Sequence, residues 1–305
     1  MSILNNITRI GIGSVFIIAA ILKLISIDEF EIYIYSFNVF SYLITTIFSR
    51  LLIAGELILG LFFIFKIHYK IAWRIMMVVQ ILFTIFLLYV TLFRHDANCH
   101  CFGDLIELSP MESIVKNIVI IGLLFTVRSQ HADVCKHRSW YSLLIVNCTL
   151  LIVFIVSPPD SIYKMIYSTE KEISTMDLYD VELQRINNDV EYDDTLAFDF
   201  DAGEHLIAVV SAGCKYCYLG VKKLAMIMKR KGLNTENVHI FIWGSDDGIR
   251  NFIKETGTQN YSYWKIEPRQ AIEITYGRFP TFIWMKDKEI VKVGNFRDID
   301  ENSIQ

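Results

Sequence analysis

The feature that most constrains this chain is a series of long apolar segments that ends near residue 157. A helix needs about 20 apolar residues to cross the hydrocarbon of a bilayer. Five segments approach that length, the fourth being the shortest: 7–27, 48–66, 72–93, 114–128 and 140–157. The sequence therefore predicts an α-helical membrane bundle of four to five transmembrane helices over residues 1–157, embedded in a lipid bilayer.

Residues 31–47, between the first two segments, are apolar but interrupted by polar and tyrosine side chains. The interruptions are Tyr33, Tyr35, Ser36, Asn38, Ser41 and Tyr42. This mixture is typical of a segment that lies in the membrane interface, and we predict that role. A further span is the alternative, and it would change only the side of the N-terminus.

Lysine and arginine are distributed unevenly between the two sides of the predicted bundle. Seven lie on one side: Arg9, Lys66, Lys70, Arg74, Arg128, Lys136 and Arg138. Three lie on the other: Arg50, Arg94 and Lys116. The side with more basic residues is normally cytoplasmic. We therefore expect a multi-pass protein of the cell (inner) membrane, with loop 94–113 and everything after residue 157 on the extracytoplasmic side.

Two ionisable residues, Lys23 and Glu56, fall inside predicted spans. Burying either charge alone is costly, and both would lie in the outer half of the membrane, so we expect them to pair. A structural ion pair or a snorkelling lysine is one interpretation, and a proton or quinone site is the other. Four glycines of these spans are expected to allow close helix packing: Gly11, Gly13, Gly55 and Gly60.

The predicted outer loop carries Cys99 and Cys101, one residue apart, with His95 and His100 beside them. A disulfide across so short a spacing forms a small ring of poor geometry, which makes it easily reduced. That chemistry favours a redox relay. A metal site and a structural disulfide to another cysteine are the alternatives, but the spacing fits no common zinc pattern. Cys135 and Cys148 are expected to be inert thiols.

The string Cys99-His100-Cys101-Phe102-Gly103, in an outer loop of a short bundle, resembles the MauE branch of the DoxX-like membrane proteins. The segment Ala20–Leu24, and Glu56 followed by Gly60, are similar to that family as well. The resemblance covers roughly residues 1–130. It implies a four-helix bundle linked to thiol redox chemistry and to disulfide maturation of methylamine dehydrogenase. A fifth span and an appended domain depart from the family pattern, which leaves the methylamine role open.

The second half of the chain is polar and has the element order of a thioredoxin fold. Residues 158–195 form an acidic linker, expected to be a tether with partial structure, and 196–305 form the domain. The apolar pattern predicts strands at 206–210, 238–243, 279–284 and 289–293, with a turn at 286–288. It predicts helices over 219–228 and 246–255, ended by Gly232 and Gly257.

The chemistry of this domain lies in Cys214-Lys215-Tyr216-Cys217, at the start of the first helix. A helix N-terminus and Lys215 both favour a thiolate at Cys214. Cys217, one turn later, would resolve a mixed disulfide at Cys214. Pro280 is expected to be cis and to shape the substrate groove. This domain has no second cysteine pair for a zinc site, and His205 and His239 fall in strands, so no metal is predicted.

These residues resemble the thioredoxin-like superfamily over about 196–305. Gly213 departs from the family, because many members have Trp at this position. The chain stops at Gln305, so the final helix is expected to be short or absent.

Together these patterns predict a membrane-tethered thiol–disulfide oxidoreductase that acts on extracytoplasmic protein thiols. Cys214 and Cys217 would exchange electrons with Cys99 and Cys101. Three alternatives stay open: a MauE-like maturation factor, a quinone-coupled disulfide generator similar to vitamin K epoxide reductase homologues, and a non-enzymatic scaffold or metal-binding protein. No cofactor is required, except a quinone in the second alternative. The net charge of −4 gives no indication of a nucleic-acid partner.

Overall fold

The computed structural model describes residues 2–94, 96–128, 138–167, 182–186, 196–197 and 203–304. It divides the chain into two compact units, Met1–Pro159 and Asp160–Gln305. The chain passes from the first unit to the second at Pro159, two residues after the predicted end of the membrane domain.

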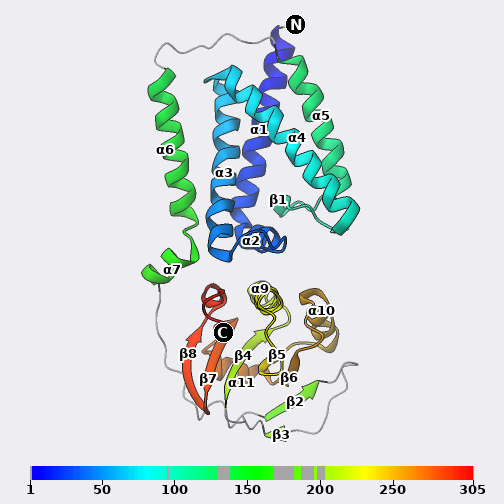
Figure 1. Ribbon diagram of the computed structural model, residues 1–305, viewed down its shortest axis with the longest axis vertical. Coiled ribbons are helices and arrows are strands. Elements are labelled where there is room, and N and C mark those ends of the chain that lie inside the picture. Colours follow the sequence, from blue (N-terminus) through cyan, green and yellow to red (C-terminus); the bar gives the residue numbers. More distant parts are fainter. Residues whose placement is uncertain are drawn as a thin grey trace. The chain divides into compact units, whose positions relative to one another are not determined.

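The first unit is a bundle of helices that run alternately in opposite directions (Figure 1). Its elements are α1 (Ser2–Ile25), α2 (Ile27–Tyr35), α3 (Tyr42–Phe65), α4 (Tyr69–Tyr89), a π-helical turn (Val90–Arg94), β1 (Cys101–Asp104), α5 (Pro110–Thr126) and α6 (Arg138–Val156). This arrangement confirms the predicted membrane bundle followed by an α/β domain.

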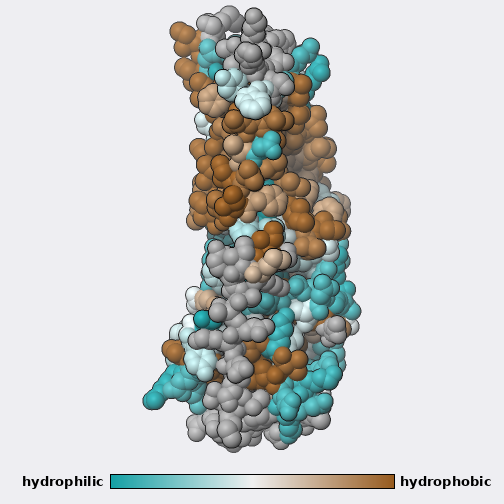
Figure 2. All heavy atoms as spheres, turned by 90° about the vertical axis from the view of Figure 1, so that its left-hand side faces the viewer, coloured by the Kyte–Doolittle hydropathy of each residue, from teal (hydrophilic) through white to brown (hydrophobic). Residues whose placement is uncertain are grey.

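Three helical segments of the described residues are long and apolar enough to cross a membrane: Ile3–Ile25, Tyr42–Phe65 and Tyr69–Arg94. Trp140–Val156 in α6 is apolar but shorter. The predicted span 114–128 falls on α5. This helix has 17 residues, with Glu112 and Lys116 in its first half, and it is not one of the three long apolar helices. Figure 2 shows the belt of apolar side chains on one face of the helices.

Helices α1 and α3 approach each other closely at two glycines, Gly13 and Gly60. A Cβ added to Gly60 would lie 2.7 Å from Ile17 Cγ1 and 2.8 Å from the Gly13 carbonyl oxygen. A Cβ on Gly13 would meet the Gly60 carbonyl at 3.0 Å. The packing role predicted for these two glycines is confirmed, whereas Gly11 and Gly55 have open space around the same position.

Residues 31–47 do not form a span in the structure, because α2 ends at Tyr35 and α3 begins at Tyr42. The fully buried Arg50 of α3 fixes this arrangement. Its guanidinium pairs with Glu31 of α2 and donates to the carbonyl oxygens of Ser157 and Pro158 at 2.6 and 2.9 Å. Arg50 therefore ties α2, α3 and the end of α6 together at one end of the bundle.

The second unit is built on one seven-stranded sheet with the order β3-β2-β6-β5-β4-β7-β8. The strands are β2 (Glu182–Ile186), β3 (Leu196–Ala197), β4 (Glu204–Ser211), β5 (Val238–Trp243), β6 (Ser262–Ile266), β7 (Thr281–Lys286) and β8 (Glu289–Gly294). The helices are α7 (Asp160–Tyr167), α9 (Lys215–Lys231), α10 (Asp246–Thr256) and α11 (Pro268–Thr275), with a 3₁₀ turn at Phe296–Asp298.

The central part of this sheet has thioredoxin-like topology. Strands β4, β5 and β6 are parallel, and β7 and β8 add to β4 as an antiparallel hairpin. Helix α9 connects β4 to β5 and packs on the sheet face that carries Phe282. Helix α11 covers the opposite face, where Ala271 and Ile274 pack against Ile207 and Val209. The peptide bond before Pro280 is cis, as predicted.

Most predicted elements of this domain are present, and several others were missed. Strand β5 has the predicted bounds, and Gly232 and Gly257 end α9 and α10 in left-handed conformation. The sequence prediction missed α7, β2, β3, β6 and α11. Two of these, α7 and β2, lie inside the predicted linker 158–195. Residues 168–181 and 187–195 of that linker are outside the described part of the chain.

Candidate active site

The Cys-x-x-Cys motif lies where the central strand β4 passes into α9. Strand β4 ends at Ser211, and Cys214 is the N-cap residue of α9, with extended backbone angles. Hydrogen bonds from the Cys217 thiol and from the backbone N–H groups of Cys217 and Tyr216 lower the pKa of the Cys214 thiol to about 6, against the opposing effect of partial burial. Cys214 is thus partly exposed and largely thiolate at neutral pH.

Cys217 has the opposite properties, because it lies on the buried side of the first turn of α9. Its side chain is fully buried, and its Sγ accepts the Ser211 N–H at 3.3 Å. Burial raises the pKa of Cys217 strongly, and its hydrogen bond to Cys214 raises it further. Both cysteines are free thiols in the structure. This asymmetry is the one expected for an attacking and a resolving cysteine.

Pro280 is buried and packs against the same helix. A Cβ on Gly220 of α9 would lie 3.3 Å from Pro280 Cγ, so glycine allows the close approach of α9 to this loop. The preceding Phe279 makes an edge contact with Trp243 at the end of β5, with ring centroids 6.2 Å apart. At Gly213 a Cβ would meet nothing within 4 Å, so the position where many family members have Trp is open.

A buried ion network lies on the Tyr216 side of α9. Tyr216, half exposed, contacts Phe296 at 5.9 Å between ring centroids. The fully buried Lys223 donates to the Phe296 carbonyl at 3.4 Å and to Asp160 Oδ2 at 3.3 Å. Asp160 also pairs with Arg297 at 2.5 Å. Helix α7 is therefore held against the helix that carries the Cys-x-x-Cys motif.

In the membrane unit, Cys99 and Cys101 are joined in a disulfide. Both sulfurs are buried, next to Leu87 of α4 and the partly buried Phe102 and Leu108. The Oγ of Ser113 on α5 lies 3.0 Å from Cys99 Sγ.

The following strand β1 lies against the end of α1. The Asp104 N–H donates to Ser26 Oγ at 3.0 Å, and Gly103, with φ of +67°, leaves no room for a side chain against Leu22 and Ser26.

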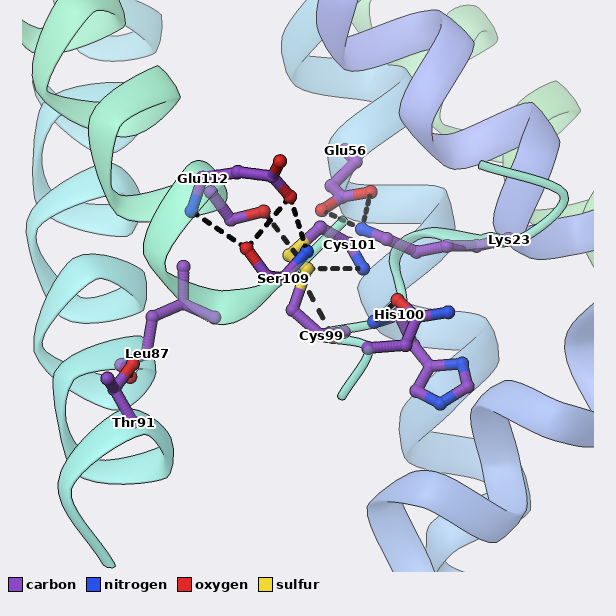
Figure 3. Close-up of a disulfide and its surroundings, with 11 residues drawn as sticks. Lys23, Glu56, Leu87, Thr91, Cys99, His100, Cys101, Ser109 and Glu112 are labelled. Carbon is purple, nitrogen blue, oxygen red and sulfur yellow. Dashed lines mark hydrogen bonds and ion pairs between the residues drawn. A yellow bond between two sulfur atoms is a disulfide. The ribbon is translucent and has the colours of Figure 1, made fainter. Parts of the chain in front are cut away.

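Lys23 and Glu56 form the predicted ion pair beside this disulfide (Figure 3). Lys23 Nζ lies 2.5 and 2.6 Å from the two carboxylate oxygens of Glu56, and Lys23 is buried. Lys23 sits between Leu22 and Ser26, the two residues that β1 contacts. Lys116 of α5 is close enough to interact electrostatically with both partners. Sequence reasoning found the pair but not its position next to the cysteines.

The histidines do not form a metal site with these cysteines in the described residues. His100 contacts the Tyr33 ring at 4.5 Å between centroids and lies 4.0 Å from Asp104, while His95 is outside the described residues. Among the residues described, no cluster of three or more His, Cys, Asp or Glu side chains could hold a metal ion. Cys135 is outside the described residues, and Cys148 is an exposed thiol on α6.

His205 and His239 approach each other across β4 and β5, with Nδ1 and Nε2 3.2 Å apart. Sequence reasoning placed both in strands but missed the contact, which depends on the β4–β5 register. His205 is at the start of β4, whereas Cys214 follows its end. Burial, and then His205, lower the pKa of His239 to about 4. The pair belongs to the scaffold of the sheet rather than to the cysteine site.

Fold and site together define a class of protein: a multi-helix membrane domain joined to a thioredoxin-like thiol–disulfide domain. Residues 1–129, which make up most of the N-terminal unit, match the family model described as methylamine utilisation protein MauE. A curated relative, Protein TlpB of Flavobacterium psychrophilum, is 28% identical over 303 residues, which cover 85% of this chain and 82% of the relative. The similarity to TlpB thus extends over both domains.

A solved structure, a secreted Mycobacterium tuberculosis disulfide oxidoreductase homologous to E. coli DsbE, also matches. It shares 10% identity with a TM-score of 0.31 and covers 40% of this chain and 87% of that chain. The thioredoxin-like assignment rests on the strand order, the Cys-x-x-Cys position and the cis-proline rather than on this match.

Proposed function

We propose that this protein is a membrane-bound thiol–disulfide oxidoreductase that acts on extracytoplasmic protein thiols or disulfides. The observation that carries the proposal is the unequal thiol pair at the start of α9. Cys214 is accessible with a lowered pKa, and Cys217 is buried with a raised pKa. Cys214 forms the mixed disulfide with a substrate, Cys217 resolves it, and Pro280 shapes the groove in which the substrate lies.

Substrate trapping tests this assignment. Cys217→Ala should accumulate mixed disulfides between Cys214 and extracytoplasmic proteins, seen as reductant-sensitive adducts after acid quenching. Cys214→Ala is the matched control and should accumulate few. Equal trapping by both variants, or none by either, would reject the roles of the two cysteines.

The second part of the proposal is electron exchange between this pair and the loop disulfide. The disulfide lies at the end of the membrane unit where β1 meets Ser26, immediately before α2. Arg50 holds Ser157 and Pro158 at α2 as well. The chain therefore leaves the membrane unit at the same end as Cys99 and Cys101, which supports placing both cysteine pairs on one side of the membrane.

The exchange needs no further reactant. The Cys214 thiolate attacks one loop sulfur, the S–S bond breaks, and the other loop cysteine leaves as a thiolate. Cys217 then attacks Cys214 and releases the second loop thiolate. Two electrons pass from the domain to the loop. The Cys217 proton, together with one from solvent, protonates the two loop thiolates. In this direction the loop donates a disulfide to the domain.

A quinone is a second candidate partner, as the acceptor that reoxidises the loop. The buried Lys23–Glu56 pair beside the disulfide favours it, because an ionisable pair inside a membrane bundle commonly marks a proton or ligand site. The test is reoxidation of the reduced loop by a soluble quinone analogue in detergent. Glu56→Gln should slow that step, and quinone-independent reoxidation would reject the candidate.

A further inference from the structure

The loop disulfide is asymmetric, and its asymmetry assigns different roles to its two sulfurs. We infer that Cys101 is the sulfur attacked in thiol–disulfide exchange, that Cys99 is the leaving thiolate, and that Ser113 is the catalytic residue that stabilises it. This inference rests on the proposed exchange for its biological context. Its geometry comes from the membrane unit alone.

Two hydrogen-bond donors point at Cys99. Ser113, fully buried, has its Oγ 3.0 Å from Cys99 Sγ, and the Cys101 N–H donates to the same sulfur at 3.3 Å. A sulfur in a disulfide has no proton, so the Ser113 hydroxyl is the donor. Donors aimed at a sulfur lower the pKa of its thiol, and the thiol of lower pKa leaves faster. Negative charge that develops on Cys99 is therefore stabilised as the bond breaks.

Cys101 has a different environment. Its Sγ faces the backbone carbonyl oxygen of Cys99 at 3.8 Å. A carbonyl oxygen accepts hydrogen bonds and repels a thiolate, so charge is disfavoured on this sulfur. The pair is thus polarised, with Cys99 as the better leaving group and Cys101 as the better electrophile.

The start of α5 holds Ser113 in place. Ser109 and Glu112 form a capping box, in which Ser109 Oγ accepts the Glu112 N–H at 3.3 Å and the Glu112 carboxylate accepts the Ser109 N–H at 2.8 Å. Ser113 follows one turn after the cap. Cys99 is bound to the same region, because its N–H donates to the Leu108 carbonyl at 2.9 Å. The helix N-terminus adds a favourable dipole for a thiolate at Cys99.

The two cysteines are attached to different parts of the bundle, so Cys101 can become exposed to an attacking thiol while Cys99 stays in place. Cys99 is held by α5, whereas Cys101 begins β1, which is held to α1 through Ser26. The exposed fractions of Cys99 and Cys101 are 2% and 3%, so attack requires the loop to open. Movement of β1 away from Ser26 exposes Cys101 and leaves Cys99 beside Ser113.

The first test uses glutathione as the attacking thiol on the full-length Cys214→Ser/Cys217→Ser protein, which retains only the loop disulfide as a redox pair. After brief reaction, acid quenching and N-ethylmaleimide treatment, fragment ions between residues 99 and 101 locate both labels. We expect glutathione on Cys101 and N-ethylmaleimide on Cys99. Glutathione on Cys99, or equal amounts on both, would overturn the inference whether or not the domain is the natural partner.

The second test applies the same mapping to Cys217→Ser, where Cys214 is the attacking thiol. The expected product joins Cys214 to Cys101 and leaves Cys99 alkylated. A Cys214–Cys99 product overturns the inference but supports the exchange. If no loop–domain product forms while glutathione still reacts at Cys101, the proposed exchange is wrong and the polarity of the disulfide stands.

Ser113→Ala tests the role of the hydroxyl, with Ser113→Thr as the conservative control that keeps it. Losing a hydrogen bond that stabilises the leaving thiolate should slow the exchange reaction by about tenfold or more. Ser113→Ala should slow glutathione attack by about tenfold and raise the alkylation pKa of Cys99 in the reduced loop, and Ser113→Thr should restore both. An unchanged rate and an unchanged pKa in Ser113→Ala, with the disulfide intact by mass spectrometry, would remove Ser113 from the mechanism.

Discussion

The two thiols of the Cys-x-x-Cys motif differ in exposure and in pKa. Cys214 is the N-cap residue of α9, whereas Cys217, three residues later, lies on the buried side of the helix. The Cys217 thiol, and then the backbone N–H groups of the first turn, lower the pKa of Cys214, whereas Cys217 is fully buried. The sequence alone predicts the direction of this difference from helix geometry. It does not predict that the Cys217 thiol is the largest contributor to the lowered pKa of Cys214, because that depends on the side-chain conformations of both residues.

The lowered pKa of Cys214 predicts its reactivity with pH. Alkylation of Cys214 by iodoacetamide in the reduced protein should rise with a midpoint near pH 6, because the thiolate is the reactive form. In Cys217→Ala the midpoint should move upward, since the strongest hydrogen bond to the thiolate is removed. Mass spectrometry of the Cys214 peptide measures both profiles, and a shared midpoint near about 8.5, the ordinary value for cysteine, would contradict the prediction.

The same shift links stability to pH. The folded pKa of Cys214, about 6, lies below the unfolded value of about 8.5. The stabilisation is therefore complete above about pH 8.5 and is lost as the pH falls through 6. Cys214→Ser lacks this contribution, so the stability difference between the reduced wild-type protein and this variant should widen from pH 6 to pH 8.5.

The Lys23–Glu56 pair predicts a non-additive response to mutation. Removing one partner leaves an uncompensated charge in the bundle, so Glu56→Gln should cost about 3–5 kcal/mol of stability. Lys23→Leu/Glu56→Leu should cost much less than either single change, because no charge is left buried. Thermal unfolding of the full chain in detergent measures both. A loss in the double variant as large as that in Glu56→Gln, or larger, would show that the two charges are not coupled.

At the level of elements, strands and helices with strong local patterns were predictable and those that depend on distant partners were not. The apolar run of β5 and the glycine that ends α9 are visible in the sequence. Strand β2 has only two buried apolar residues, Leu183 and Ile186, and exists because it pairs with β6 about 80 residues later. Helix α11 did carry a signal that was overlooked, Pro268 at its first position.

The burial of Lys223 likewise could not be predicted from the local sequence. Lys222 and Lys223 are adjacent in an amphipathic helix, and nothing local distinguishes them. Lys223 is fully buried because Asp160, 63 positions earlier, supplies its counter-charge at 3.3 Å. The ion pair in turn makes α7 part of the domain rather than part of a tether. Burial of a charge follows from the tertiary partner and not from the helix pattern.

The α1–α3 contact gives a prediction with a matched control on the same helix. Gly60→Ala places a methyl group within 3 Å of Ile17 and Gly13, so it should destabilise the protein by about 1–3 kcal/mol through overpacking. Gly55→Ala enters open space and should be neutral or stabilise by up to about 1 kcal/mol through helix propensity. Thermal unfolding in detergent compares the two, and similar effects at both sites would contradict the packing role of Gly60.

For the whole molecule, part of the acidic segment 158–195 is built into the folded units rather than lying between them. Ser157 and Pro158 are bound by Arg50 in the first unit, and Asp160 is bound by Lys223 and Arg297 in the second. Strand β2 is also part of the sheet. From Asp160 onward, the described residues of the predicted linker therefore belong to the second unit, so 158–195 is not a free tether over its full length.

Membrane topology is the prediction on which two proposals depend: activity on extracytoplasmic protein thiols, and electron exchange between the Cys-x-x-Cys pair and the loop disulfide. The helices α1, α3, α4, α5 and α6 run alternately between two ends of the first unit (Figure 1). One end holds the disulfide, Ser26 and Ser157, and the other holds Arg9, which donates to the Phe63 carbonyl at 2.7 Å, and Tyr69, bonded to Val127. The end near Arg9 carries most of the basic residues, so it should be cytoplasmic.

A pair of reporter fusions tests this orientation. Alkaline phosphatase, which is active only outside the cytoplasm, should be active when fused after Gln305 and inactive when inserted at Lys70. A fluorescent protein that requires the cytoplasm should give the reverse pattern at the two sites. Phosphatase activity at Lys70 without activity after Gln305 would invert the bundle. The Cys-x-x-Cys pair would then face the reducing cytoplasm, where extracytoplasmic thiols cannot be its substrates.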